Sequence, residues 1–258
     1  MFSNQVLTAF LISVAAGLAT SIGGILTFFV KRDNMKMLAL GLSFSAGVML
    51  YISFMDILPD AINWLGGAFG EKKGSLLAVS IFLAGILLVA LVDYLMPDHV
   101  TKDMITDHRR KLKRVGILAA IAIAFHNFPE GLATFMTGLK SISLSIPIAI
   151  AIALHNIPEG ISVALPIYNA TGKKRKAFFW ASLSGMAEPL GAILGFLILK
   201  DYLNDVTFGI LFALIAGIMI YLSLDELLPL ANEYDESHHG IIGVSLGIMV
   251  MAFAMIYI

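Results

Sequence analysis

The sequence has no cysteine and very little charge. Only 14% of its 258 residues are Asp, Glu, Lys or Arg, whereas a soluble globular domain carries about 25%. Without cysteine there is no disulfide framework and no thiolate to bind a metal. The formal net charge of −1 gives no indication of a nucleic-acid partner. Residues 1–5 lack the basic region of a cleavable signal peptide, so we expect the first apolar run to remain as a membrane span.

What the sequence has instead is long apolar runs. Hydrophobic residues make up 59% of the chain, and the mean hydropathy is +0.89. A helix of about 20 apolar residues is long enough to cross a bilayer. The sequence therefore predicts an all-α polytopic membrane protein with eight transmembrane helices, in a single transmembrane domain of residues 1–258. The expected spans are residues 4–30, 37–59, 75–96, 116–139, 145–168, 177–199, 206–229 and 241–257.

The positive charges are distributed unevenly over the connections between these runs. The first, third and fifth connections carry 13 of the 17 Lys and Arg residues. Short loops rich in Lys and Arg stay in the cytoplasm, so we expect these connections to be cytoplasmic and both termini to lie outside. The seventh connection is acidic over residues 233–239. This run, like His99 and His108 in the third connection, is either a cation-binding segment or simply a solvated surface.

A six-residue phrase is repeated in two neighbouring apolar runs. It reads His-Asn-Phe-Pro-Glu-Gly at residues 126–131 and His-Asn-Ile-Pro-Glu-Gly at residues 155–160. Ionisable residues are costly inside a membrane and usually mark a functional site. Polar side chains can also merely hold two helices together, but that role does not require a nearly identical phrase. Because consecutive spans are antiparallel, the two copies predict an inverted site at the middle of the membrane.

The spacing within each phrase brings metal-binding groups to one face of a helix. Residues three and four apart are neighbours on a helix, so His126, Asn127 and Glu130 project to a common side. Their counterparts His155, Asn156 and Glu159 do the same. Imidazole nitrogens, carboxylates and amide oxygens suit Zn(II), Fe(II), Mn(II) or Co(II).

Proline and glycine complete the phrase. Pro129 and Pro158 have no N–H, so we expect a broken helical turn at each. Such a turn is tolerated in a membrane only inside the bundle or beside a water-filled cavity. Gly131 and Gly160 follow directly and leave room for a close approach of neighbouring helices.

Two further runs carry candidate residues. The sixth run contains Glu188 followed by a proline, which predicts another broken turn. The second run contains a stripe of side chains at three- and four-residue steps that can line a path for a cation, with Met49 as a soft thioether ligand. The alternative is that Met49 only packs and that Asp56 lies near the membrane surface. The stripe consists of Ser45, Met49, Ser53 and Asp56.

The two phrases, together with Glu188-Pro189, resemble the ZIP (Zrt-, Irt-like) family of metal-ion transporters, and most of all its bacterial zinc-uptake branch. The resemblance covers essentially the whole chain, and the paired phrase is much more specific than any single residue in it. It implies an eight-helix bundle arranged as three, two and three helices with an inverted repeat. It also implies a binuclear metal site between the fourth and fifth spans.

The resemblance further implies which residues bind the ions. Met49 matches a methionine that contributes in some relatives, whereas Asp56 stands where many eukaryotic members carry a histidine. The long His-rich loop of those members is reduced here to residues 97–115. The first metal position would be lined by His126, Glu130, His155 and Glu159, and the second by Asn127, Glu130, Asn156, Glu159 and Glu188, so that Glu130 and Glu159 bridge both ions.

We therefore expect a transporter, not an enzyme, that carries Zn(II) into the cytoplasm across a bacterial inner membrane. Fe(II), Mn(II), Co(II) and Cd(II) are further candidate substrates. We expect no prosthetic group, and the partners are divalent metal ions, the lipid bilayer and, as an open alternative, a second copy of the chain.

Two other classes of protein use similar side chains. An intramembrane zinc-dependent hydrolase would activate a zinc-bound water with a glutamate as general base, but the sequence has no His-Glu-x-x-His phrase. A di-metal carboxylate redox protein usually carries Glu-x-x-His, whereas here the histidine precedes the glutamate by four residues.

Overall fold

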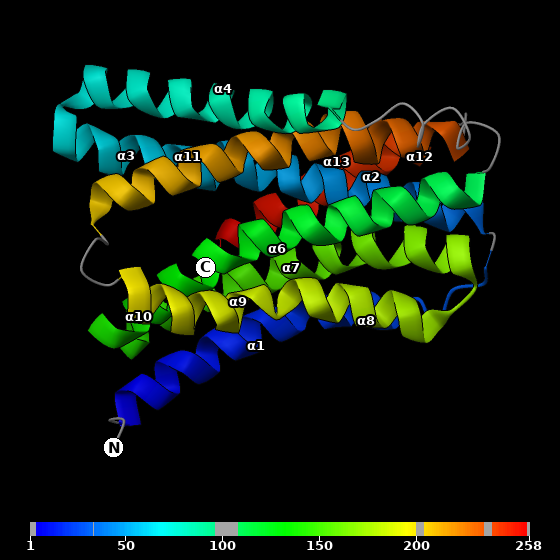
Figure 1. Cartoon of the computed structure of the whole chain (residues 1–258), viewed down its shortest axis with the longest axis horizontal. Helices are drawn as coiled ribbons and strands as arrows, with labels where there is room; N and C mark the ends of the chain where they lie inside the picture. Colours follow the sequence, from blue (N-terminus) through cyan, green and yellow to red (C-terminus); the bar gives the residue numbers. More distant parts are fainter. Residues whose placement is uncertain (1–3, 33, 96–107, 200–203, 235–238, 257–258) are drawn as a thin grey trace.

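The computed structural model describes residues 4–32, 34–95, 108–199, 204–234 and 239–256. Within these ranges every regular element is a helix, and the labelled helices lie side by side in one bundle (Figure 1). Three of the elements, η1 to η3, are wider π-helical segments. The elements are α1 (Asn4–Leu26), α2 (Met35–Ile52), η1 (Ser53–Ile57), α3 (Leu58–Phe69), α4 (Glu71–Leu95), α6 (His108–Lys140), α7 (Ile142–Thr171), α8 (Lys174–Gly185), α9 (Ala187–Leu190), η2 (Gly191–Gly195), α10 (Phe196–Leu199), α11 (Asp205–Tyr221), η3 (Leu222–Leu227), α12 (Leu228–Tyr234) and α13 (His239–Ile256).

Consecutive elements join into long rods that follow the predicted spans in order. Among the described residues, seven rods are long and apolar enough to cross a membrane: α1, α2–α3, α4, α6, α8–α10, α11–α12 and α13. This confirms the prediction of an all-α polytopic membrane protein. The remaining rod, α7, has 30 residues and includes the second phrase, but it is not among these seven.

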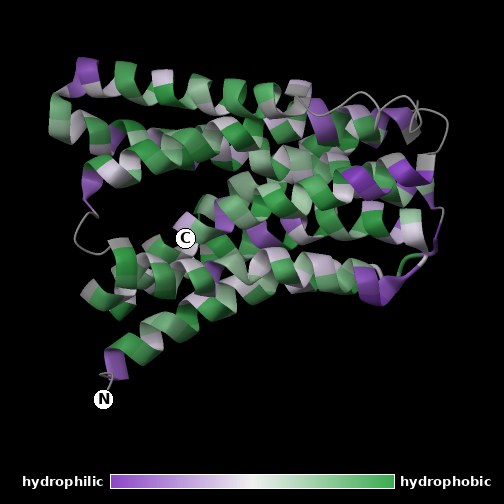
Figure 2. Ribbon diagram, in the orientation of Figure 1, coloured by the Kyte–Doolittle hydropathy of each residue, from purple (hydrophilic) through white to green (hydrophobic). Residues whose placement is uncertain are grey.

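The two ends of the bundle differ in character. In Figure 1, α1 begins and α13 ends towards the left-hand end. Figure 2 shows hydrophobic residues along the rods and hydrophilic ones near their ends, clearly where α6 and α8 begin at the opposite end. These starts carry the basic runs His-Arg-Arg-Lys and Lys-Arg-Lys. The basic starts of α6 and α8 therefore lie at the opposite end of the bundle from the start of α1 and the end of α13.

The second rod is longer than predicted because a proline does not end it. The helix runs through Pro59 to Phe69, although we expected the span to end at residue 59. Pro59 lies in the first turn of α3, where its missing N–H is tolerated. The preceding turn widens into η1, in which the N–H of Leu58 donates to the carbonyl of Ser53, five residues back.

The seventh rod repeats this arrangement in the opposite direction. In η3 the N–H of Leu228 donates to the carbonyl of Ser223, again five residues back and directly before a proline. The two rods run antiparallel (Figure 1). Both contain the pattern Tyr-x-Ser-x-x-acidic-x-Leu-Pro-x-Ala, at residues 51–61 and 221–231. This is a second inverted repeat, which we did not predict because the two copies share only one acidic position.

The helices form two groups. The first group contains α1, α6, α7 and the rod α8–α10, and the second contains the rods α2–α3, α4, α11–α12 and α13. Most tertiary contacts lie within a group, and the main contact between the groups is that of α2 with α7. Both phrases belong to the first group.

Candidate metal centre

The residues of the two phrases meet inside the first helix group. The faces of α6 and α7 that carry them are turned towards each other, and α9 adds Glu188 from a third helix. Each side chain is at most 4% exposed. A cluster of ionisable and amide groups is therefore removed from lipid and water alike. The buried side chains are His126, Asn127, Glu130, His155, Asn156, Glu159 and Glu188.

The histidines and glutamates contact one another across the two helices. Nε2 of His126 lies 3.2 Å from Oε1 of Glu130 on its own helix and 3.3 Å from Oε1 of Glu159 on α7. Nε2 of His155 lies 3.3 Å from Oε1 of Glu130. The ring centroids of His126 and His155 are 6.1 Å apart. Two imidazoles and two carboxylates thus enclose one small space.

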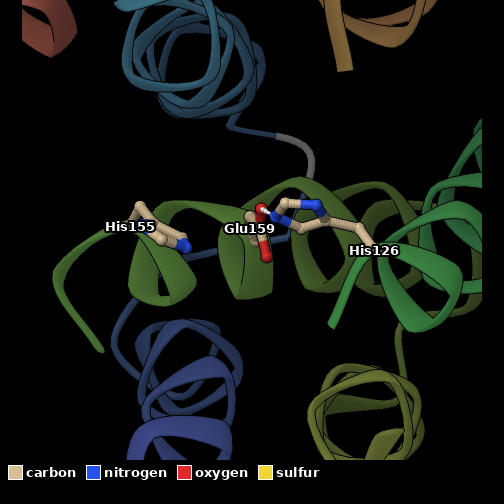
Figure 3. A group of neighbouring side chains, drawn as sticks. All are labelled: His126, His155 and Glu159. Carbon is tan, nitrogen blue, oxygen red and sulfur yellow. Dashed lines mark ion pairs between the residues drawn. The ribbon is translucent and has the colours of Figure 1, made fainter. Parts of the chain in front are cut away.

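Three of these residues have the arrangement of a metal site. One ligand atom from each of His126, His155 and Glu159 lies within 4.8 Å of the other two. Figure 3 shows the imidazole of His126 reaching from α6 towards Glu159 on α7, with His155 one turn before it. The same spacing lets a single cation contact atoms of both helices.

Several buried polar atoms of the site make no hydrogen bond to any other described residue. These atoms can each coordinate a cation, and burying them without a partner costs free energy, about 1–3 kcal/mol for a neutral group. The donor set of imidazole nitrogens and carboxylate or amide oxygens fits a divalent cation such as Zn(II). The atoms without such a partner are Nδ1 of His126, Oε2 of Glu159, Oδ1 of Asn127, Oδ1 of Asn156 and Oε2 of Glu188.

The two asparagines are oriented by their amide nitrogens. Nδ2 of Asn127 donates to the carbonyl oxygen of Ser184 at 3.3 Å. Nδ2 of Asn156 donates to the carbonyl oxygen of Ala16 at 3.0 Å and also to Oε1 of Glu188. Because the nitrogens are bound to α8, α1 and α9, the amide oxygens are left as acceptors.

Glycines bring the helices around the site into close contact, as predicted for two of them. A Cβ atom at Gly131 would collide with the backbone carbonyl of Glu188, and one at Gly160 with that of Thr20. A Cβ at Gly191 would likewise collide with the carbonyl of Phe128. Only glycine allows this approach, which holds α6 against α9 and η2, and α7 against α1.

The prolines behave differently from the prediction in two of three places. Both α6 and α7 continue as helices through Pro129 and Pro158. A proline removes one helical hydrogen bond, and packing on the flanking turns holds the rest of the helix together. The helix does break before Pro189, where Met186 forms a turn between α8 and α9.

The four residues of the predicted stripe lie on α2 and η1, and they differ in their surroundings. Met49 is 2% exposed and belongs to an apolar cluster with Leu42 and Ile52. Ser45 donates a hydrogen bond to the backbone of α7. Asp56 is half-buried and close enough to His155 and Glu130 to interact with them electrostatically. Asp56 is thus the residue of the four whose charge acts on the site. A role of Met49 as a metal ligand stays a prediction.

Some candidate residues cannot be placed. His99 and residues 235–238 of the acidic run lie outside the described residues, as does the side chain of His108.

The basic connections have a second role that we did not predict. Arg32 donates from its guanidinium to the carbonyls of Asn169 and Ala170, both at 3.3 Å, and so caps the C-terminal turn of α7.

Known proteins of one family match the chain over nearly its whole length. The family model described as ZIP Zinc transporter matches residues 7–115 and 102–255. The chain is 49% identical to "Zinc transporter ZupT" of Streptococcus mutans, over 98% of both chains. It is 47% identical to "Zinc transporter ZupT" of Clostridium perfringens, over 98% of this chain and 96% of that one. The protein of the same name from Campylobacter jejuni is 45% identical, over 98% and 97%. The chain therefore belongs to the ZIP zinc transporter family.

Proposed function

We propose that the protein carries Zn(II) across a bacterial inner membrane into the cytoplasm through the cluster on α6, α7 and α9. The observation that carries this proposal is the buried cluster of two histidines and three glutamates, several of whose atoms make no hydrogen bond to another residue that the structure describes. A divalent cation cannot enter lipid without its water shell being replaced. Imidazoles and carboxylates provide that replacement and offset the charge of the ion. Fe(II), Mn(II), Co(II) and Cd(II) are further proposed substrates.

We propose that the site holds two ions. His126, Glu130, His155 and Glu159 would line the first position, and Asn127, Asn156 and Glu188, with the same two glutamates, the second. The contacts of Glu130 with both histidines support a bridging role. The hydrogen bond between Asn156 and Glu188 supports a second position beside the first.

The proposed transport domain is the whole chain with eight spans, including α7. A helix of 30 residues is about 45 Å long, which exceeds the hydrocarbon thickness of about 30 Å. The two inverted repeats support an arrangement of three, two and three helices around a pseudo-two-fold axis. The basic starts of α6 and α8 support a cytoplasmic location for their end of the bundle, with both termini outside. A homodimer stays a prediction.

We propose that the ion enters past two carboxylates on the second rod. Asp60 is exposed and interacts electrostatically with the half-buried Asp56, which in turn interacts with His155 and Glu130. These groups lead from the end of the bundle that holds the termini to the buried cluster. A cation would therefore meet negative charge at each step towards the site.

Family membership argues against the two other classes of protein, the zinc-dependent hydrolase and the di-metal redox protein. The family model and the similar proteins are those of zinc transporters, so the hydrolase and the redox protein are not proposed. A protein that carries zinc across a membrane must also release it. Release is possible from this site because its ligands come from three helices, α6, α7 and α9, which can move apart.

Zinc-65 uptake into proteoliposomes tests the proposal. We expect saturable uptake by the wild type and background uptake by a Glu130→Ala, Glu159→Ala double variant, since both charges that would bridge the ions are lost. Glu71→Ala is the matched control, because Glu71 is an exposed carboxylate at the start of α4. Wild-type uptake by the double variant, when it is folded and inserted, would overturn the assignment of the site.

A further inference from the structure

We infer that Ser45 is a positioning residue that fixes α7 relative to α2 and so holds the site in the conformation described here. The inference rests on the proposed transport function, because it concerns the contact that must change when the site opens. It adds a residue that binds no ion and lies in the other helix group.

Ser45 connects the two helix groups by a hydrogen bond. Its side chain is 0% exposed, and its Oγ donates to the carbonyl oxygen of Pro158 at 2.6 Å. Pro158 directly precedes Glu159, a residue of the proposed metal site. The bond therefore connects the second helix group to the backbone beside that glutamate.

The surrounding contact between α2 and α7 is apolar. A Cβ atom at Gly41 would contact the side chains of Leu165 and Ile161 on α7, so the two helices pack closely there. Both side chains belong to the same apolar cluster as Leu42 of α2. Apolar contacts hold the two helices together but are not directional. A hydrogen bond requires a defined distance and angle and therefore fixes one position of α7.

Ser45 has a second acceptor that makes this bond reversible. Its Oγ also lies 2.9 Å from the carbonyl oxygen of Gly41, one turn earlier on α2. A hydroxyl group has one proton and can rotate. When α7 moves away, the hydroxyl can turn fully to Gly41, and no donor is left unpaired. Breaking the bond then costs the contact with the Pro158 carbonyl, but not the larger penalty of a buried donor without any acceptor.

The position of this bond matches what alternating access requires. Transporters commonly open by moving one bundle of helices against another around the binding site. Here the main contact between the groups is that of α2 with α7. One net hydrogen bond corresponds to a roughly 2- to 10-fold change in the ratio of two conformations. Ser45 is therefore expected to favour the described conformation by about that factor.

Spin-label distance measurements between the groups test the inference. Because the chain has no cysteine, labels can be attached to Phe179→Cys on α8 and Leu87→Cys on α4, which are 58% and 67% exposed. We expect Ser45→Ala to shift the ratio of the distance populations roughly 2- to 10-fold away from the wild-type distance.

Ser43→Ala is the matched control. Ser43 lies on the same helix and is equally buried. Among the described residues, the hydrogen bonds of its Oγ stay within α2, to Ala39 at 2.7 Å and Leu40 at 3.3 Å, and it faces Gly243 of its own group. We expect this variant to keep the wild-type populations even if it melts at a lower temperature. Identical populations in both serine variants would overturn the inference. The distance readout needs no transport, so failure of the proposed function would appear separately, as wild-type uptake in the Glu130→Ala, Glu159→Ala variant.

Discussion

Among single residues, the asparagines show how a neutral side chain can contribute to a cation site. Each uses its amide nitrogen as a donor to the backbone of a neighbouring helix, so that the amide oxygen is left free. A carboxylate could not do this, because it has no proton to donate. The asparagines therefore place an acceptor at the site without adding another charge beside the glutamates.

Replacement of Asn156 by Asp is expected to change metal selectivity. Asn156→Asp removes the donor to Ala16 and to Glu188 and sets a second carboxylate against Glu188. We expect zinc uptake to fall at least tenfold and the preference among Zn(II), Fe(II) and Mn(II) to shift, because removal of a hydrogen-bond partner from a buried charge costs more than about 1.4 kcal/mol. Competition of unlabelled metals with zinc-65 uptake measures both effects.

Asn127→Asp provides the comparison for this prediction. Its amide nitrogen donates to the Ser184 carbonyl and not to Glu188, so we expect a smaller loss of uptake. Equal effects of the two substitutions would show that the contact with Glu188 does not matter. Unchanged competition profiles in both would remove the asparagines from the set of selecting residues.

The sequence pointed to residues that the structure brings together where the chemistry is carried by the side chain itself. The repeated histidines and glutamates are recognisable from their letters because such residues are rare in a membrane span. The role inferred for Ser45 was not predictable in this way. Its partner is a backbone carbonyl 113 positions away, and backbone atoms leave no signal in a sequence.

At the scale of helices, the glycines determine which elements can surround the site. We expect Gly160→Ala to destabilise the protein by about 1–3 kcal/mol, because the new methyl group would meet the Thr20 carbonyl on α1. The midpoint of thermal unfolding in detergent measures the effect. Gly67→Ala is the control, since nothing lies within 4 Å of a Cβ atom there. A midpoint for Gly160→Ala equal to that of Gly67→Ala would contradict the close approach of α7 and α1.

The ends of the helices were predicted less accurately from hydropathy than their order. The order of the spans followed from the apolar runs, but the rods extend beyond several predicted limits. The apolar run predicts an end at residue 59, although Pro59 lies in the first turn of α3, which follows the π-helical segment η1. Hydropathy reports how apolar a segment is, and it does not report a change of helical winding, which depends on single hydrogen bonds.

In the whole molecule, two inverted repeats lie in different parts of the same bundle, one in each helix group. The phrases on α6 and α7 place chemically equivalent groups on both sides of the buried cluster. The repeats in the rods α2–α3 and α11–α12 each place a half-buried carboxylate within a π-helical segment, Asp56 in η1 and Glu226 in η3. An inverted pair gives a site the same kind of access from either side, which suits alternating exposure of a bound ion.

The orientation of the bundle in the membrane decides whether the proposed entrance at Asp60 faces outwards or the cytoplasm. Labelling of single introduced cysteines measures this orientation. Glu71 at the start of α4 and Lys173 directly before α8 are exposed and lie at opposite ends of the bundle. Because the chain has no cysteine of its own, the unmodified protein is an unlabelled control. We expect a membrane-impermeant maleimide to label Glu71→Cys in intact cells and Lys173→Cys only after permeabilisation, since basic loops remain in the cytoplasm. The reverse pattern would place Asp60 on the cytoplasmic side and make the proposed entrance an exit.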